Sequence, residues 1–285
     1  EMLRSLVGSE MCIRDSLQTV APPAYPLTDN GRKRSLYVLL ALIGSLIFIT
    51  TYFLLIEVLD RTLRNPYRST RLTGLPVISA FNGISNLKYR GFLKTCNRIA
   101  AAYSCRRLNK YMRTGQPTVI NLLSINSREG KSFLAKYFSN YWQSEGLRVR
   151  IVTHGRDFDV TDRNYVQARK LHDFWVPNEA EQTPDIILVE YPAIKDAGIP
   201  LPVLQEADVN LLIANACRLW RDSDTTTMTP FKEALKDTPF MLYLNNADRE
   251  VVESFTGELP PKTPVRSFFN RLSQFGLTSQ KNAVK

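Results

Sequence analysis

Short apolar runs alternate with longer helical stretches from Thr118 onward. This alternation is typical of βαβ units, in which crossover helices join parallel strands. We therefore predict an α/β fold with a mostly parallel sheet flanked by helices. The first helix is predicted from Lys131 to Glu145, where large apolar side chains recur at helical spacing. The predicted strands are Val119–Ser124, Val149–Thr153, Ile186–Glu190, Val209–Ala214 and Phe240–Asn245.

An uncharged apolar stretch runs from Ser35 to Ile56, ahead of this region. As a helix its 22 residues would be about 33 Å long, enough to cross the hydrocarbon core of a bilayer. The stretch has no polar stripe of the kind that a buried core helix would show. We predict a transmembrane helix over residues 35–59, with the lipid bilayer as its partner. The flanking arginines slightly favour a cytoplasmic C-terminal side.

Basic residues are concentrated directly after this predicted helix. Between Arg61 and Arg113 there are twelve Lys/Arg and no Asp/Glu, whereas from Thr114 onward there are 20 Lys/Arg against 21 Asp/Glu. A basic segment suits nucleic acid or anionic lipid head groups. The neighbouring membrane helix favours lipid, so we expect no nucleic-acid partner.

The basic segment itself is predicted in two parts. Residues Leu59–Ala80 read as a helix end and a loop, because Pro66, Gly74 and Pro76 interrupt them. A basic helix is predicted from about Leu87 to Arg113, lying near lipid head groups or packing on the next domain.

The predicted organisation has five parts. Residues 1–16 resemble peptide translated from sequencing-adapter DNA, so we treat them as an artefact of sequencing or assembly. A proline-rich periplasmic lead-in over 17–34 and the transmembrane helix over 35–59 follow. We then expect a basic juxtamembrane linker and helix over 60–117 and a P-loop domain over 118–285.

The first predicted strand ends in a candidate phosphate-binding loop. A buried strand, a polar turn and a helix beginning Gly130-Lys131-Ser132 are the order that such a loop needs, because helix N-termini present unpaired N–H groups to an anion. Lys131 would reach the phosphates of ATP or ADP, and the Ser132 hydroxyl would help to hold Mg²⁺. The full pattern has Gly where Ile125 stands. The predicted nucleotide-binding residues are Ser127, Arg128, Glu129, Gly130, Lys131, Ser132 and Phe133.

A second acidic group is needed to hold magnesium, usually at the end of a later strand. Glu190 has that place at the end of the run Asp185-Ile-Ile-Leu-Val-Glu190. We predict Ser132 and Glu190 as the magnesium residues, and Glu190 is also the one candidate catalytic residue that the motifs offer.

The order of these motifs resembles a known family. Leu59-Asp60, Thr73-Gly-Leu-Pro-Val77, Glu129-Gly-Lys-Ser132 and Ala207-Asp208 follow a proline-rich lead-in and an apolar helix. This order resembles the C-terminal half of the polysaccharide chain-length determinants that carry a bacterial tyrosine kinase (BY-kinase) domain. The resemblance implies a P-loop NTPase-like fold, the bacterial inner membrane, a cytoplasmic kinase-like domain, homo-oligomers, and the machinery that polymerises and exports capsular polysaccharide, exopolysaccharide or O-antigen.

The chain departs from the family pattern at two places. Ser127-Arg128 stands where the family loop has Pro-Gly, and the Asp-x-Asp motif that supplies magnesium contact and the catalytic base falls on Thr153 and Gly155. Asp157 and Asp159 are the acidic residues nearby. We therefore expect an inactive or weak relative of the tyrosine kinases. The alternatives are an active autokinase that uses altered acidic residues and a membrane-anchored partitioning-type ATPase.

Overall fold

The computed structural model describes residues 31–83, 91–176 and 183–261, with side chains from Ser35 onward. The expectations for residues 1–16 and for most of the lead-in over 17–34 lie outside these ranges. The chain divides into two units, Glu1–Leu59 and Asp60–Lys285.

The described part of the first unit is one helix, α2 (Gly31–Leu59). Its 25 residues Ser35–Leu59 are long and apolar enough to cross a membrane, and within the described ranges no other helix is. The hydroxyl of Ser45 donates to the Leu42 carbonyl oxygen at 2.8 Å, and that of Thr50 donates to the Leu46 carbonyl oxygen. These two polar groups are therefore satisfied within the helix, as a lipid environment requires.

The second unit is built on a six-stranded sheet in the order β1-β6-β5-β2-β4-β3, in which every strand pair is parallel. The predicted α/β class is confirmed. The five predicted strands are all present. The strand that begins at Ile186 extends three residues further than expected, and the strand that begins at Phe240 extends two residues further. The strands are β1 (Val77–Asn82), β2 (Thr118–Ser124), β3 (Val149–Thr153), β4 (Ile186–Ala193), β5 (Val209–Asn215) and β6 (Phe240–Ala247).

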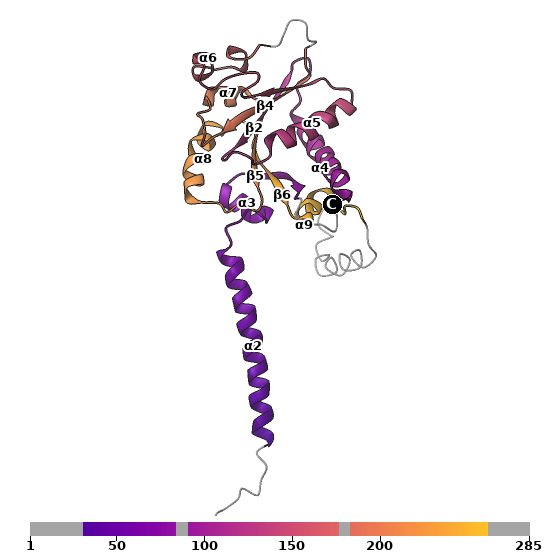
Figure 1. The fold of residues 1–285 in the computed structure, drawn as a ribbon, viewed down its shortest axis with the longest axis vertical. Coiled ribbons are helices and arrows are strands. Elements are labelled where there is room, and N and C mark those ends of the chain that lie inside the picture. The colour runs from indigo at the N-terminus through magenta and orange to yellow at the C-terminus, as the bar shows by residue number, and fades with distance from the viewer. Residues whose placement is uncertain (1–30, 84–90, 177–182, 262–285) are drawn as a thin grey trace, which may run out of the picture. The chain divides into compact units, whose positions relative to one another are not determined.

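Helices lie on both faces of the sheet (Figure 1). The α4 and α5 helices pack together on one side, and α7 and α8 lie on the other. The helical elements are α3 (Pro66–Thr73), α4 (Leu93–Leu108), η2 (Asn109–Tyr111), α5 (Lys131–Ser144), α6 (Arg163–Val166), η3 (Leu171–Asp173), α7 (Leu201–Glu206), α8 (Asp222–Ala234) and α9 (Arg249–Thr256).

The expectation of a loop over Leu59–Ala80 is wrong, because this segment forms α3 and the edge strand β1. The three residues that suggested a loop mark element boundaries instead. Pro66 occupies the first turn of α3, where a missing N–H costs nothing. Gly74 ends the helix with φ 68°, and the Pro76 carbonyl oxygen accepts the Leu242 N–H at 2.9 Å.

The basic helix predicted from about Leu87 to Arg113 is present as α4 over the shorter range Leu93–Leu108, and it packs against the sheet and α5. Its buried residues include Cys96, Ala100, Cys105 and Leu108. Of the two placements left open for the basic helix, packing on the domain is the one seen. Residues 60–117, expected as a separate linker and helix, contribute a strand and packed helices to the compact unit that begins at Asp60.

An aromatic cluster fills the space between the sheet and these two helices. The centroid of the Tyr243 ring lies 5.6 Å from that of Phe81 and 5.8 Å from that of Phe138. The buried Tyr243 hydroxyl lies 3.1 Å from the Ser104 hydroxyl, so its polar atom has a partner in the core. This packing holds α5, and therefore the loop that it follows, against β6 of the sheet.

Candidate functional site

The candidate loop lies at the carboxyl end of β2, a central strand between β5 and β4. It connects Ser124 to α5, whose first turn presents unpaired N–H groups to the loop. Gly130 is required at the start of α5 for two reasons. Its φ is +98°, and a Cβ there would lie 2.0 Å from the Asn245 Nδ2 atom. The same Asn245 amide donates to the Glu129 carbonyl oxygen at 2.9 Å, so the loop is held against β6.

Lys131 and Ser132 are the first two residues of α5, and both are engaged at the loop. The Lys131 ammonium donates to the Ser124 hydroxyl at 2.5 Å. Burial lowers the pKa of Lys131 from its ordinary value of 10.5, against the opposite effect of the nearby carboxylates of Glu190 and Glu129. The Ser132 hydroxyl donates to a carboxylate oxygen of Glu190. The structure therefore brings together the lysine, the hydroxyl and the acidic residue that the motifs named.

Glu190 reaches the loop because β4 pairs directly with β2, with Leu122 opposite Glu190. The Glu190 side chain is buried, with the residue 7% exposed. A hydroxyl and a carboxylate are oxygen ligands of the kind that Mg²⁺ takes together with water and phosphate. The donor set at Ser132 and Glu190 thus fits the predicted ion.

The remaining predicted nucleotide-binding residues lie differently. Ser127 and Arg128 are exposed at the tip of the loop. Arg128 has φ 62°, a left-handed conformation that costs a residue with a Cβ about 1–2 kcal/mol. Phe133 lies away from the loop, with its ring 4.9 Å from that of Tyr137 and 5.8 Å from that of Phe81.

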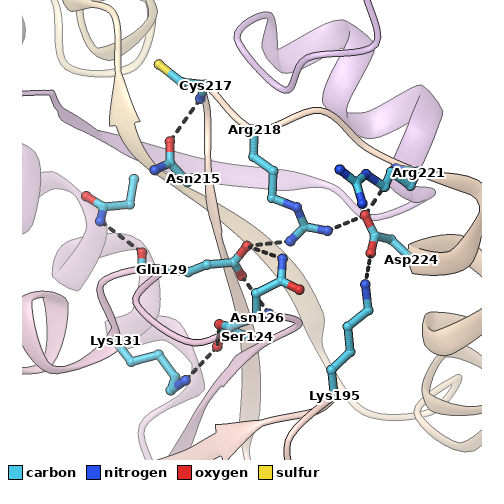
Figure 2. Close-up of polar contacts among 11 residues, drawn as sticks. Ser124, Asn126, Glu129, Lys131, Lys195, Asn215, Cys217, Arg218, Arg221 and Asp224 are labelled. Carbon is cyan, nitrogen blue, oxygen red and sulfur yellow. Dashed lines mark hydrogen bonds and ion pairs between the residues drawn. The ribbon is translucent and has the colours of Figure 1, made fainter.

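Four residues that the motifs did not identify complete the site (Figure 2). Arg218 forms ion pairs with Glu129 in the loop and with Asp224 at the start of α8. Asp224 also pairs with Lys195 at 2.6 Å. The fourth residue is Asn245, described above. These residues follow or end β4, β5 and β6, so only the strand order brings them to the loop.

The buried carboxylate of Asp224 is well compensated. Its side chain is 1% exposed, and burial by itself would raise its pKa. Hydrogen bonds from Lys195, the Arg221 N–H and Arg218 outweigh burial and hold the pKa below the ordinary value of 3.8. Asp224 is therefore ionised in the folded protein at neutral pH.

The positions of the family's Asp-x-Asp motif lie at the end of β3, beside the loop. Thr153, the first of them, is paired in register with Glu190. Asp157 accepts the Thr153 N–H at 2.8 Å and pairs with Arg156 at 2.9 Å and Arg150 at 3.3 Å. Its carboxylate therefore holds the turn after β3.

Asp159, the other acidic residue near this position, also serves the local turn. Its carboxylate accepts the Thr161 N–H at 3.0 Å. Within the described ranges, no group of three or more His, Cys, Asp or Glu side chains is placed to hold a metal ion.

No family model matches the chain, and no curated protein matches it. Several solved structures are similar to it at low identity. The kinase domain of the Escherichia coli tyrosine kinase ETK is 12% identical, with 65% of this chain and 94% of that chain covered and a TM-score of 0.46. The BceF tyrosine kinase domain is 13% identical over 64% of this chain and 98% of its own, with a TM-score of 0.42. The chimerical protein CapA2B2 is 10% identical over 65% of this chain and 100% of its own, with a TM-score of 0.45.

Two of these three structures are tyrosine kinase domains, the class that the sequence resembles.

Proposed function

We propose that the chain is a membrane-anchored, BY-kinase-like protein whose loop over Ser127–Ser132 binds ATP or ADP with little or no phosphoryl transfer. One observation carries this proposal. Lys131, Ser132 and Glu190 converge where β2 meets the N-terminus of α5, which is the arrangement that a nucleotide phosphate and its Mg²⁺ require.

Each of these groups has a part in binding. The Lys131 ammonium would exchange its contact with Ser124 for a phosphate oxygen, and the N–H groups of the first turn of α5 would donate to the same phosphate. Ser132 and Glu190 would hold Mg²⁺, which neutralises phosphate charge when bound.

Weak transfer is supported by the surroundings of β3. Thr153 and Gly155 carry no carboxylate, and Asp157 is already paired with two arginines and a main-chain N–H. A tyrosine hydroxyl would therefore meet no carboxylate at either position of the motif, and the nearby Asp157 carboxylate is held in the turn after β3. Loss of a general base typically costs about 10²–10⁴-fold in rate.

The cellular role follows from the resemblance and from the apolar helix. We infer an inner-membrane protein with its α/β domain in the cytoplasm, where ATP is present. The role would be regulation of polysaccharide chain length and export, as part of a homo-oligomer that contacts the polymerisation and export machinery. The exposed apolar surface of Ser35–Leu59 supports the membrane anchor.

The test uses the full chain in lipid nanodiscs. We expect ADP binding in the presence of Mg²⁺ by calorimetry, at least about tenfold weaker in Lys131→Met because a buried charge-assisted contact to phosphate is lost. Lys136→Met, which changes an exposed lysine one turn further along α5, should bind as the unmodified chain does. We expect no phosphotyrosine after incubation with ATP and Mg²⁺.

Two results would contradict the proposal. Phosphotyrosine that Lys131→Met abolishes would show an active autokinase. Absence of binding at millimolar ADP would show that the loop holds no nucleotide.

A further inference from the structure

We infer that Arg218 is a positioning residue for nucleotide binding, because it neutralises the Glu129 carboxylate and so lets a loop with a buried carboxylate accept a phosphate. This inference rests on the proposed nucleotide site and assigns a role to a residue outside the loop motif. Arg218 lies beyond β5, far from the loop in sequence, and it reaches the loop from the neighbouring strand.

The Glu129 carboxylate places a buried negative charge within the candidate phosphate-binding loop. Its side chain is 4% exposed, and one of its oxygens lies 3.5 Å from the main-chain nitrogen of Asn126. It is also close enough to the Lys131 ammonium to raise the pKa of that group. An uncompensated carboxylate at this place would repel a phosphate at the same lysine, and low exposure leaves little solvent to screen the repulsion.

Arg218 supplies the compensating charge. One arm of its guanidinium contacts Glu129 and the other contacts Asp224, and its side chain is 15% exposed. The guanidinium also lies over the Trp220 ring, 5.6 Å from its centroid. Lys195 contacts Asp224 in turn, so the ion pairs run from Glu129 through Arg218 and Asp224 to Lys195 (Figure 2). Negative and positive side chains alternate along this series, and their four charges sum to zero.

The main chain at Arg218 is also held in place, by main-chain contacts with residues 62 and 63. The Leu63 N–H donates to the Arg218 carbonyl oxygen at 3.3 Å, and Thr62 and Leu219 form an isolated antiparallel bridge. A planar fork on a fixed backbone can bind both carboxylates at once. A lysine ammonium has no such fork, so it is a poor substitute here.

The two carboxylates allow the roles of Arg218 to be separated. Loss of Arg218 leaves both Glu129 and Asp224 short of a partner, which lowers stability through both. Only Glu129 belongs to the loop that takes the phosphate. Removal of its charge should therefore restore nucleotide affinity in a chain without Arg218, whereas removal of the Asp224 charge should restore stability alone.

The experiment measures ADP affinity at pH 7.5 for the full chain in nanodiscs, with thermal unfolding as the measure of folding. We expect Arg218→Met to weaken ADP binding at least about tenfold, since a like charge close to the ligand goes unopposed. Addition of Glu129→Gln should bring the affinity back to within about threefold of the unmodified chain. Addition of Asp224→Asn should leave it weak. Arg221→Met, an exposed side chain in the same segment, is the matched control and should bind normally.

Each outcome decides the question. Equal weakness of Arg218→Met and its Glu129→Gln double variant, with both folded, would overturn the inference and leave the proposed nucleotide site intact. Absence of ADP binding by the unmodified chain would overturn both. If Arg218→Met does not fold, the neutral variant Arg218→Gln with and without Glu129→Gln gives the same comparison, and a failure of Glu129→Gln to improve binding there would overturn the inference.

Discussion

The carboxylate of Asp224 shows how closely stability and the candidate site are joined at single residues. It accepts hydrogen bonds from Lys195, Arg218 and the Arg221 N–H, all within the network that reaches the loop. The folded state holds its pKa below 3.8, so the unfolded chain takes up the proton first as the pH falls. The stabilisation from this carboxylate is complete above its unfolded pKa and is lost as the pH falls through the folded one.

We therefore expect Asp224→Asn to flatten the acid dependence of stability below about pH 5. At pH 7 the variant should be less stable than the unmodified chain, since Arg218 and Lys195 both lose a charged partner. Denaturant titrations from pH 3 to pH 7 measure both effects. Asp222→Asn, whose side chain is 95% exposed, is the control and should leave the slope unchanged. Identical slopes for Asp224→Asn and the unmodified chain would contradict this assignment.

At the scale of elements, the segment Arg61–Leu63 acts as a short tie between the start of the second unit and the segment that carries Arg218. The Trp220 N–H donates to the Arg61 carbonyl oxygen at 3.0 Å, on the other side of the Thr62–Leu219 bridge from Leu63. Leu63 itself is completely buried. The tie is thus anchored by main-chain hydrogen bonds and by one core side chain.

Leu63→Ala should lower the free energy of unfolding by about 2–5 kcal/mol, as for other buried leucines that leave a cavity. Arg61→Ala is the control, because the Arg61–Asp222 pair is exposed and worth about 1 kcal/mol or less. Chemical denaturation of the two variants side by side checks the contrast. A loss below 1 kcal/mol for Leu63→Ala would show that the tie contributes little.

The sequence pattern predicted the elements that have strong apolar periodicity. It missed α3 and β1, which are bounded by proline and glycine residues. The strands β2 to β6 were foreseen because each is a continuous apolar run between helices. The strand β1 was missed because Gly74 and Pro76 directly precede it. Glycine and proline between a helix and a strand give the same sequence pattern as glycine and proline within a loop. In α3 the Asn65 side chain accepts the Tyr67 N–H at 2.9 Å, a capping signal that could have revealed the helix.

The candidate site, like the fold, was predictable only in part. Lys131, Ser132 and Glu190 lie in local motifs, and the structure brings them together. The other residues of the site lie in no motif: Arg218, Asp224, Lys195 and Asn245. They come close to Glu129 only because of the order of the parallel strands, which a single sequence does not fix.

For the whole molecule, the compact unit that begins at Asp60 sets where the chain can be divided. A fragment of residues 60–285 keeps β1 on β6, whereas a fragment of residues 118–285 leaves β6 as a bare edge. An unpaired edge strand is a template for pairing with other chains. We expect the longer fragment to remain in solution without detergent and the shorter one to aggregate, as measured by light scattering after size-exclusion chromatography. Equal behaviour of the two would show that β1 is dispensable.

The pairing of β1 with β6 also has a consequence for synthesis of the protein. Among the strands that the structure describes, the first to leave the ribosome carries Val77, which is in register with Leu242 in the last of them. Parallel pairing of strands so far apart in the sequence is slow, because the chain between them loses conformational entropy when the loop closes, before the strands make contact. The nascent chain therefore carries β1 unpaired until the residues between β1 and β6 have been translated. The sheet can close on that side only after β6 has emerged, so a chain truncated before residue 240 should be a ready substrate for chaperones and proteases.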